Sequence, residues 1–180
     1  MDEFAMKTWI IAVVLSLLAG CCASAARAAV PAAAMNKTIT VSYTVTGLAK
    51  DPQSQRTWNF STAVTRIIYV SSAGRLFMRH SATQGRDAIG GDYGPGSRGN
   101  GNFSFQGTKL VGVTPFAGGA RQITIDFDSG FSSCTASIIE GHAAGGAIER
   151  KAPNGQMRVL LSVSTSQPSC SIRSGNLFAE

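Results

Sequence analysis

Residues 119–141, GARQITIDFDSGFSSCTASIIEG, decide the fold class, because they read as two β-strands joined by a tight Asp-Ser-Gly turn. In the first strand Ile123, Ile125 and Phe127 share one face, and the intervening polar residues take the other face. This period of two is typical of a strand with one buried side. The second strand begins at Cys134 and alternates small apolar residues with hydroxyl residues. The stretch therefore predicts an antiparallel hairpin.

The same alternation recurs on both sides of this hairpin. Residues 38–46, TITVSYTVT, predict the clearest strand of the chain, and Gly47 is expected to end it. Residues 66–79 predict a second hairpin with its turn around Gly74. Residues 156–164 alternate as well. Their apolar face is predicted to consist of Met157, Val159, Leu161 and Val163.

About eight to ten such strands, joined mostly by short turns, predict an all-β fold. Consecutive hairpins favour an antiparallel meander that forms a β-sandwich or an up-and-down barrel. Residues 37–180 have the size of a single domain. Within it, residues 85–101 are so rich in glycine that we expect a loop without regular structure. Loops of this length inside a domain are often functional.

The N-terminus resembles an export signal. Residues 9–20, WIIAVVLSLLAG, are apolar or small and follow Lys7. Such a run has the length of a signal-peptide core and is too short to cross a bilayer comfortably. We assign residues 1–28 to a signal peptide that forms a helix, and residues 29–36 to a tether. The protein is therefore expected to be exported to the periplasm, anchored as an outer-membrane lipoprotein or secreted.

The end of this signal has two readings. Residues 18–21, Leu-Ala-Gly-Cys, resemble the lipobox of bacterial lipoproteins. That resemblance, which covers only this segment, implies cleavage before Cys21 and a lipid on its sulfur. The alternative is ordinary cleavage after an A-x-A motif, which occurs at residues 23–25 and 26–28. Contact with a membrane is expected only through such a lipid anchor or through an uncleaved signal.

Two cysteines lie in the predicted β-domain. Cys134 and Cys170 each fall on a predicted strand, and an exported protein folds in an oxidising compartment. The sequence therefore predicts a disulfide between them, with two free buried thiols as the alternative. A metal site is not predicted, because two cysteines lack the further ligands that zinc needs.

Charge is sparse and spread along the chain. The formal net charge is +6, while only 14% of the residues are charged, against about a quarter in an average protein. Scattered arginines predict a solvated basic surface rather than a nucleic-acid site, which shows clustered basic residues with aromatics between them. Weak attraction to envelope components or acidic polymers is compatible with this charge, and we expect a monomer. The arginines concerned are Arg56, Arg66, Arg75, Arg79, Arg86, Arg98, Arg121, Arg158 and Arg173.

Catalytic motifs are absent from the sequence. It contains no Gly-x-Ser-x-Gly, HExxH, phosphate-loop or CxxC pattern. The two histidines, His80 and His142, are predicted to lie on the surface. No catalytic residue, cofactor or metal ligand is predicted, and an enzyme is the less favoured class.

Three functions remain open. The first is a non-catalytic binding or structural role for an exported β-domain of the cell envelope. The second is a barrel-type carrier of a small apolar ligand. The third is a hydrolase or enzyme inhibitor that acts through the glycine-rich residues 85–101. The aromatic residues that would line a carrier's cavity are Trp58, Phe60, Tyr69, Phe77, Phe103 and Phe105.

Overall fold

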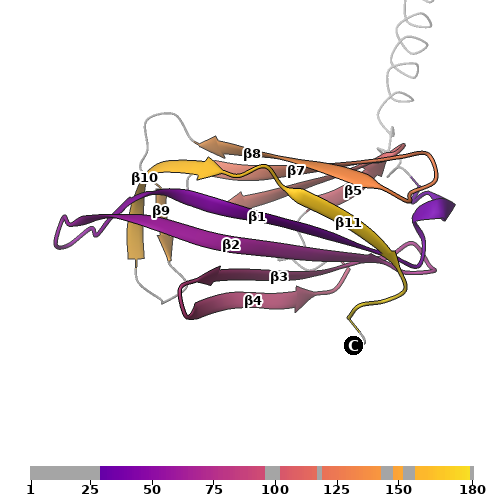
Figure 1. The fold of residues 1–180 in the computed structure, drawn as a ribbon, viewed down its shortest axis with the longest axis horizontal. Helices are drawn as coiled ribbons and strands as arrows, with labels where there is room; N and C mark the ends of the chain where they lie inside the picture. Colours follow the sequence, from indigo (N-terminus) through magenta and orange to yellow (C-terminus); the bar gives the residue numbers. More distant parts are fainter. Residues whose placement is uncertain (1–28, 96–101, 117–118, 143–147, 152–156, 179–180) are drawn as a thin grey trace, which may run out of the picture.

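The computed structural model describes residues 29–95, 102–116, 119–142, 148–151 and 157–178. Within these ranges eleven strands form two antiparallel sheets (Figure 1). The all-β, antiparallel prediction is confirmed, with slightly more strands than expected. The predicted signal helix and Cys21 lie within residues 1–28, outside the described part of the chain.

The larger sheet has seven strands in the order β4-β3-β2-β1-β10-β9, and β11 also pairs with β1. The smaller sheet has four strands in the order β5-β6-β7-β8. Each sheet contains four successive hairpin-connected strands, so the predicted meander exists twice. The strands of the larger sheet are β1 (Lys37–Lys50), β2 (Thr57–Val70), β3 (Leu76–Gln84), β4 (Asp87–Tyr93), β9 (Ile148–Lys151), β10 (Met157–Thr165) and β11 (Ser169–Ser174). Those of the smaller sheet are β5 (Asn102–Gln106), β6 (Lys109–Phe116), β7 (Gly119–Phe127) and β8 (Cys134–His142).

Strand β1 is the centre of the larger sheet. On one side it pairs with β2 over its whole length, and on the other it pairs first with β11 and then with β10. Strands β10 and β11 therefore behave as one long strand that is interrupted near Pro168. Proline has no backbone N–H to donate to a sheet, which accounts for the interruption.

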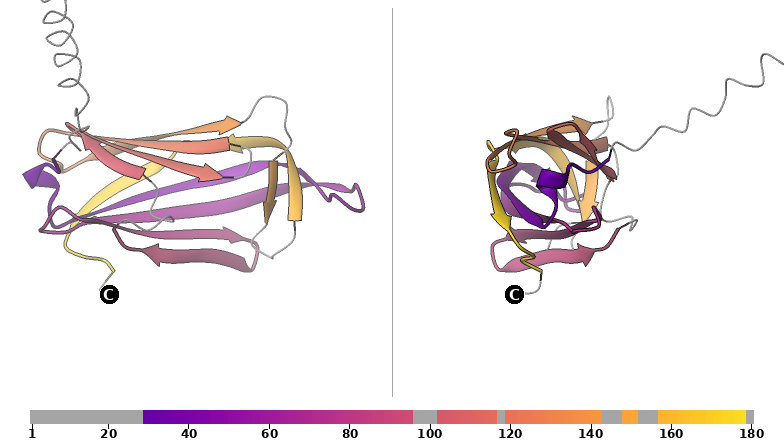
Figure 2. Two further views of the ribbon diagram at one scale, coloured as in Figure 1. Left: turned by 180° about the vertical axis from the view of Figure 1, so that it is seen from behind. Right: turned by 90° about the vertical axis from the view of Figure 1, so that its right-hand side faces the viewer.

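The two sheets face each other, as Figure 2 shows from two directions, and their inward faces share one core. Ile123, Ile125 and Phe127 of β7 are all buried, as their alternation predicts. From β1, Ile39 and Val41 meet them across the core. Each buried aliphatic or aromatic side chain of this kind stabilises the fold by about 1.5–3 kcal/mol relative to exposure.

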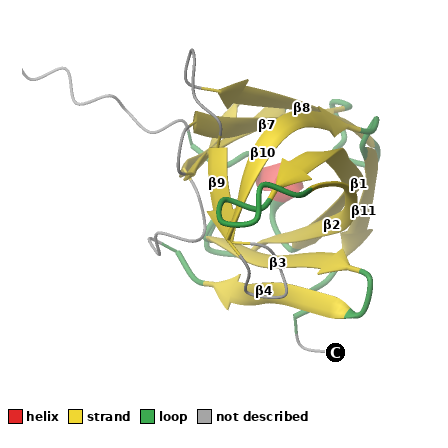
Figure 3. Cartoon of the chain, turned by 90° about the vertical axis from the view of Figure 1, so that its left-hand side faces the viewer, coloured by secondary structure: helices red, strands yellow, loops and turns green. Residues whose placement is uncertain are grey.

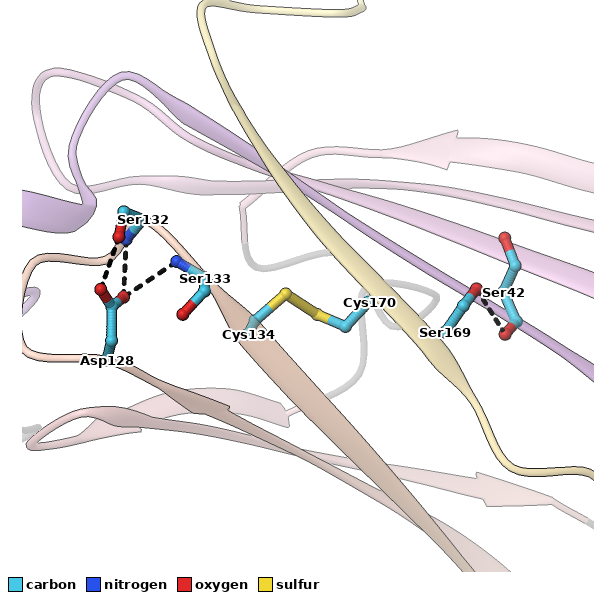
Figure 4. Close-up of a disulfide and its surroundings, with 7 residues drawn as sticks. All are labelled: Ser42, Asp128, Ser132, Ser133, Cys134, Ser169 and Cys170. Carbon is cyan, nitrogen blue, oxygen red and sulfur yellow. Dashed lines mark hydrogen bonds between the residues drawn. A yellow bond between two sulfur atoms is a disulfide. The ribbon is translucent and has the colours of Figure 1, made fainter.

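The connection between β7 and β8 is longer than the predicted Asp-Ser-Gly turn. It spans residues 128–133, and the Asp128 carboxylate accepts hydrogen bonds from the backbone N–H groups of Ser132 (2.6 Å) and Ser133 (2.9 Å) (Figure 4). The hydrogen bond from the Ser132 hydroxyl and these N–H groups holds the pKa of Asp128 below its usual value. Phe131 takes a positive φ of 53° and stacks on Phe127, with ring centroids 4.8 Å apart.

The predicted disulfide is present. Cys134 at the start of β8 bonds to Cys170 on β11, with a Cα–Cα distance of 5.7 Å (Figure 4). The two strands belong to different sheets. Beside the disulfide, the Ser169 hydroxyl donates a hydrogen bond to the Ser42 carbonyl at 3.3 Å. The disulfide therefore joins the two sheets covalently along one side of the core.

Four further local predictions differ from the structure. Strand β1 continues through Gly47, where the missing side chain leaves room for the Phe60 ring of β2. Within residues 85–101, β4 pairs with β3, and Gly90 fits against the His80 carbonyl where a side chain would collide. Of the predicted tether, residues 32–34 form a 3-10 turn, and Ala34 is buried in the core.

The fourth difference concerns β10. Strand β10 is present as predicted, but Met157 and Leu161 are 48% and 47% exposed, while Arg158 and Leu160 point inward. The register between β1 and β10 shifts by one residue at Leu161. Such a β-bulge leaves one residue unpaired and moves the preceding side chains to the opposite face.

Candidate binding site, an arginine-lined cavity

A cavity of about 130 Å³ lies between the two sheets. It is near the end of the molecule where β9 and the start of β10 turn across the other strands, which is the end that Figure 3 faces. Five strands of the larger sheet contribute to its wall, and β7 contributes from the smaller sheet. The wall consists of Val45, Phe60, Thr62, Val64, His80, Ala82, Ile89, Arg121, Arg158 and Leu160.

Three arginines are buried at this end of the core. Arg66 on β2 is 3% exposed, Arg121 on β7 is 8% exposed and Arg158 on β10 is 5% exposed. Each occupies an inward position of its strand, in phase with buried apolar residues. The prediction of a solvated basic surface is therefore wrong for these three residues. Burial of a guanidinium costs several kcal/mol unless the charge and its N–H groups find partners.

Arg121 has the most complete set of partners. It forms an ion pair with Glu140, its direct cross-strand neighbour on β8, and its Nε donates to Oε1 of that carboxylate at 2.6 Å. Its Nη1 donates to the Tyr43 hydroxyl at 3.3 Å. The Tyr43 hydroxyl also accepts from Nε of Arg66 at 3.4 Å. The partner atoms of Arg66 among the described residues are this hydroxyl and the thioether sulfur of Met78, and both are neutral.

Arg158 is partnered incompletely. Its Nη1 donates to Oε1 of Gln84 at 2.8 Å, and its guanidinium lies 4.3 Å from the centre of the Phe60 ring. Its Nε is buried and has no hydrogen-bond partner among the described residues. Burial lowers the pKa of this guanidinium. The Thr62 hydroxyl donates to the same Gln84 oxygen at 3.3 Å, so this amide already serves two donors.

His80 lies in the cavity wall rather than on the surface as predicted. Burial, together with the positive charges of Arg66 and Arg121, lowers the pKa of His80 to about 4. The imidazole is therefore neutral at pH 7 and can donate one hydrogen bond without adding a charge. His142 ends β8, and its side chain lies outside the described part of the structure.

The aromatic residues expected to line a carrier's cavity do not gather there. Among the six, Phe60 contributes to the cavity wall. Phe103 and Phe105 are buried in the core on β5. Tyr69 and Phe77 pack against each other, with ring centroids 6.2 Å apart.

The described residues bear on metal sites and membrane-spanning helices, but not on the lipid acceptor. They contain no group of three or more residues that could hold a metal ion, and no helix among them is long and apolar enough to cross a membrane. The proposed lipid acceptor Cys21 lies outside them. Comparison with models of protein families, with curated proteins and with solved structures gives no match for this chain.

Proposed function

We propose that this protein is an exported β-domain with a non-catalytic binding role in the cell envelope, and that it binds its ligand in the arginine-lined cavity. The observation that carries the proposal is Arg158, a guanidinium that is almost fully buried in the cavity wall with one N–H unpaired. A side chain selected for stability alone would be apolar here, because an unpaired buried donor costs about 1–3 kcal/mol. A ligand with a polar group that compensates the charge of this guanidinium explains the arrangement.

Export is supported by the apolar segment at residues 9–20 and by the disulfide, which is compatible with an oxidising compartment. Two mature forms are proposed, one lipidated on Cys21 and one cleaved after an A-x-A motif. Mass spectrometry of the N-terminal peptide from fractionated cells distinguishes them. A lipid-modified Cys21 peptide in the membrane fraction supports an anchored lipoprotein. An intact N-terminus in the cytoplasm would contradict export.

The binding role is tested by filling the cavity. Ala82 is buried and lines the cavity, so Ala82→Leu would occupy part of the space. Ala63, exposed on β2, provides the matched control Ala63→Leu. We expect small solutes of at least one charge class to raise the melting temperature of the wild type and of Ala63→Leu, but not of Ala82→Leu. Equal shifts in all three proteins would contradict binding in the cavity.

The alternative of an apolar-ligand carrier is less favoured by the geometry. Such a carrier needs an apolar pocket of several hundred Å³. The cavity is about 130 Å³, and His80, Arg121 and Arg158 lie in its wall. A ligand with a polar group fits this wall better than a hydrocarbon.

A further inference from the structure

The cavity has more positive charge around it than the described residues neutralise. Arg66, Arg121 and Arg158 are buried within one end of the core, and the carboxylate paired with them in the described structure is Glu140. The hydrogen-bond acceptors of Arg66 and Arg158 are neutral oxygen or sulfur atoms. Uncompensated positive charge in a low-dielectric interior attracts an anion strongly.

The donors that face the cavity match a single acidic group. The donor-bearing side chains of the wall are Thr62, His80, Arg121 and Arg158, and the Nε of Arg158 is itself covered by protein atoms. A carboxylate has two oxygens and accepts such charge-assisted hydrogen bonds well. The Thr62 hydroxyl already donates to Gln84, and Arg121 already donates to Glu140 and Tyr43. Arg158 and the His80 imidazole are therefore the principal donors.

The apolar part of the cavity wall constrains the remainder of the ligand, beyond its acidic group. Six of its ten residues are apolar, namely Val45, Phe60, Val64, Ala82, Ile89 and Leu160. Phosphate and sulfate have four strongly hydrated oxygens, and such a wall would leave some of them without donors. A ligand whose remaining atoms are aliphatic packs well against such an apolar wall. The volume of about 130 Å³ is slightly below that of a cavity that takes up benzene, about 150 Å³.

We infer that the cavity binds a small aliphatic monocarboxylate of about four or five carbon atoms, with its carboxylate beside Arg158 and its hydrocarbon body against the apolar wall. This inference rests on the proposed binding function and names the ligand class for the same cavity. Ile89 is 45% exposed and lines the cavity from β4, so the ligand enters beside this side chain.

The test compares isobutyrate with isobutyramide, which has the same shape and no charge. Melting temperatures and calorimetric titrations of the full-length protein are measured at pH 7 and constant ionic strength. We expect isobutyrate to bind and to raise the melting temperature, and isobutyramide to do neither. Arg158→Gln should weaken the affinity on the order of 10- to 100-fold, because a charged hydrogen bond is lost. The matched control Arg79→Gln removes an exposed arginine that pairs with Asp92, and it should bind as the wild type does.

Each other outcome overturns part of the argument. Stabilisation by inorganic phosphate or sulfate without any effect of isobutyrate would overturn the carboxylate inference and leave the binding function standing. Equal binding of isobutyrate and isobutyramide would show that the negative charge of the ligand is not recognised, and would overturn the carboxylate inference. Stabilisation by every anion, chloride included, that Arg158→Gln does not change would indicate an adventitious ion only. Absence of binding by any solute, together with a higher melting temperature for Arg158→Met, would overturn both proposals. The comparison of the two solutes on the wild type decides the inference even where a variant does not fold.

Discussion

Between the same two sheets, one end of the core is filled with aromatic and aliphatic side chains, whereas the other end contains three buried guanidinium groups. At the apolar end the ring of Phe105 lies 6.2 Å from each of Phe127 and Phe131, and the gap beside Ile39 has no room for a water molecule. At the basic end a cavity of about 130 Å³ remains. Apolar burial stabilises a fold, while buried ion pairs contribute little net stability or reduce it. The apolar end therefore holds the fold together, and the basic end is available for binding.

The largest expected loss of stability comes from removing a side chain at the apolar end. Phe105→Ala removes a buried ring between the sheets and should lower the free energy of unfolding by about 3–5 kcal/mol. Phe77→Ala, which removes a less buried ring of similar size on β3, should cost about 1 kcal/mol. Urea titration of both variants at pH 7 measures the difference. Equal losses would mean that the aromatic cluster is not the main source of stability.

The next effect concerns the disulfide, which lies toward the apolar end, since Cys134 pairs with Phe127 across β7 and β8. Replacing Cys134 and Cys170 by serine should lower the free energy of unfolding by about 3–4 kcal/mol, because the closed loop has a sequence separation of 36. Amide hydrogen exchange should rise first in β8 and β11. If amide exchange rose first around Arg158 instead, the disulfide would mainly stabilise the basic end of the core, which would contradict this prediction.

A smaller loss is expected when the ion pair at the basic end is weakened. Glu140→Gln keeps an acceptor for Arg121 but removes the charge, and should cost about 2 kcal/mol. The matched control Asp92→Asn changes an exposed ion pair with Arg79 and should cost much less, because solvent screens this pair. Thermal unfolding of both variants is the measurement. A larger loss for Asp92→Asn would contradict the burial of the Arg121 pair.

The effect that is smallest at pH 7 is a pH dependence, because it develops only as the pH falls. His80 has a folded-state pKa of about 4, below its ordinary value of 6.5, so the unfolded chain binds more protons between these values. Its contribution to stability is complete above about pH 6.5 and is lost as the pH falls toward 4. His80→Gln should lack this part of the decline when unfolding is measured from pH 7 to pH 4.5. Parallel curves for the two proteins would show that His80 is solvated.

The sequence predicts most of the fold, because strand alternation and cysteine placement are local signals. The hairpin around Ile123 and Ile125 and the disulfide of Cys134 with Cys170 are as expected. Strand β4 was not predicted, because its hydrogen bonds come from the neighbouring β3 and compensate for the poor strand propensity of glycine.

The candidate site was only partly accessible to sequence reasoning. Arg121 shares its face with Ile123 and Ile125, and Arg66 shares its face with Ile68, so their phase within the strands marks them as inward-pointing. The prediction of a solvated basic surface does not take this local signal into account. Arg158 gave no such signal, because its direction depends on the bulge at Leu161, and a bulge is set by pairing with β1 rather than by local residues.

The cystine between residues 134 and 170 has a consequence for how the molecule responds to a protease. A protease that cuts anywhere between these two positions produces fragments that remain covalently joined. Such a nick is invisible on a non-reducing gel and appears as two bands only after a thiol is added. The severed molecule keeps both of its sheets attached to each other, so a single cut between these positions does not release either one.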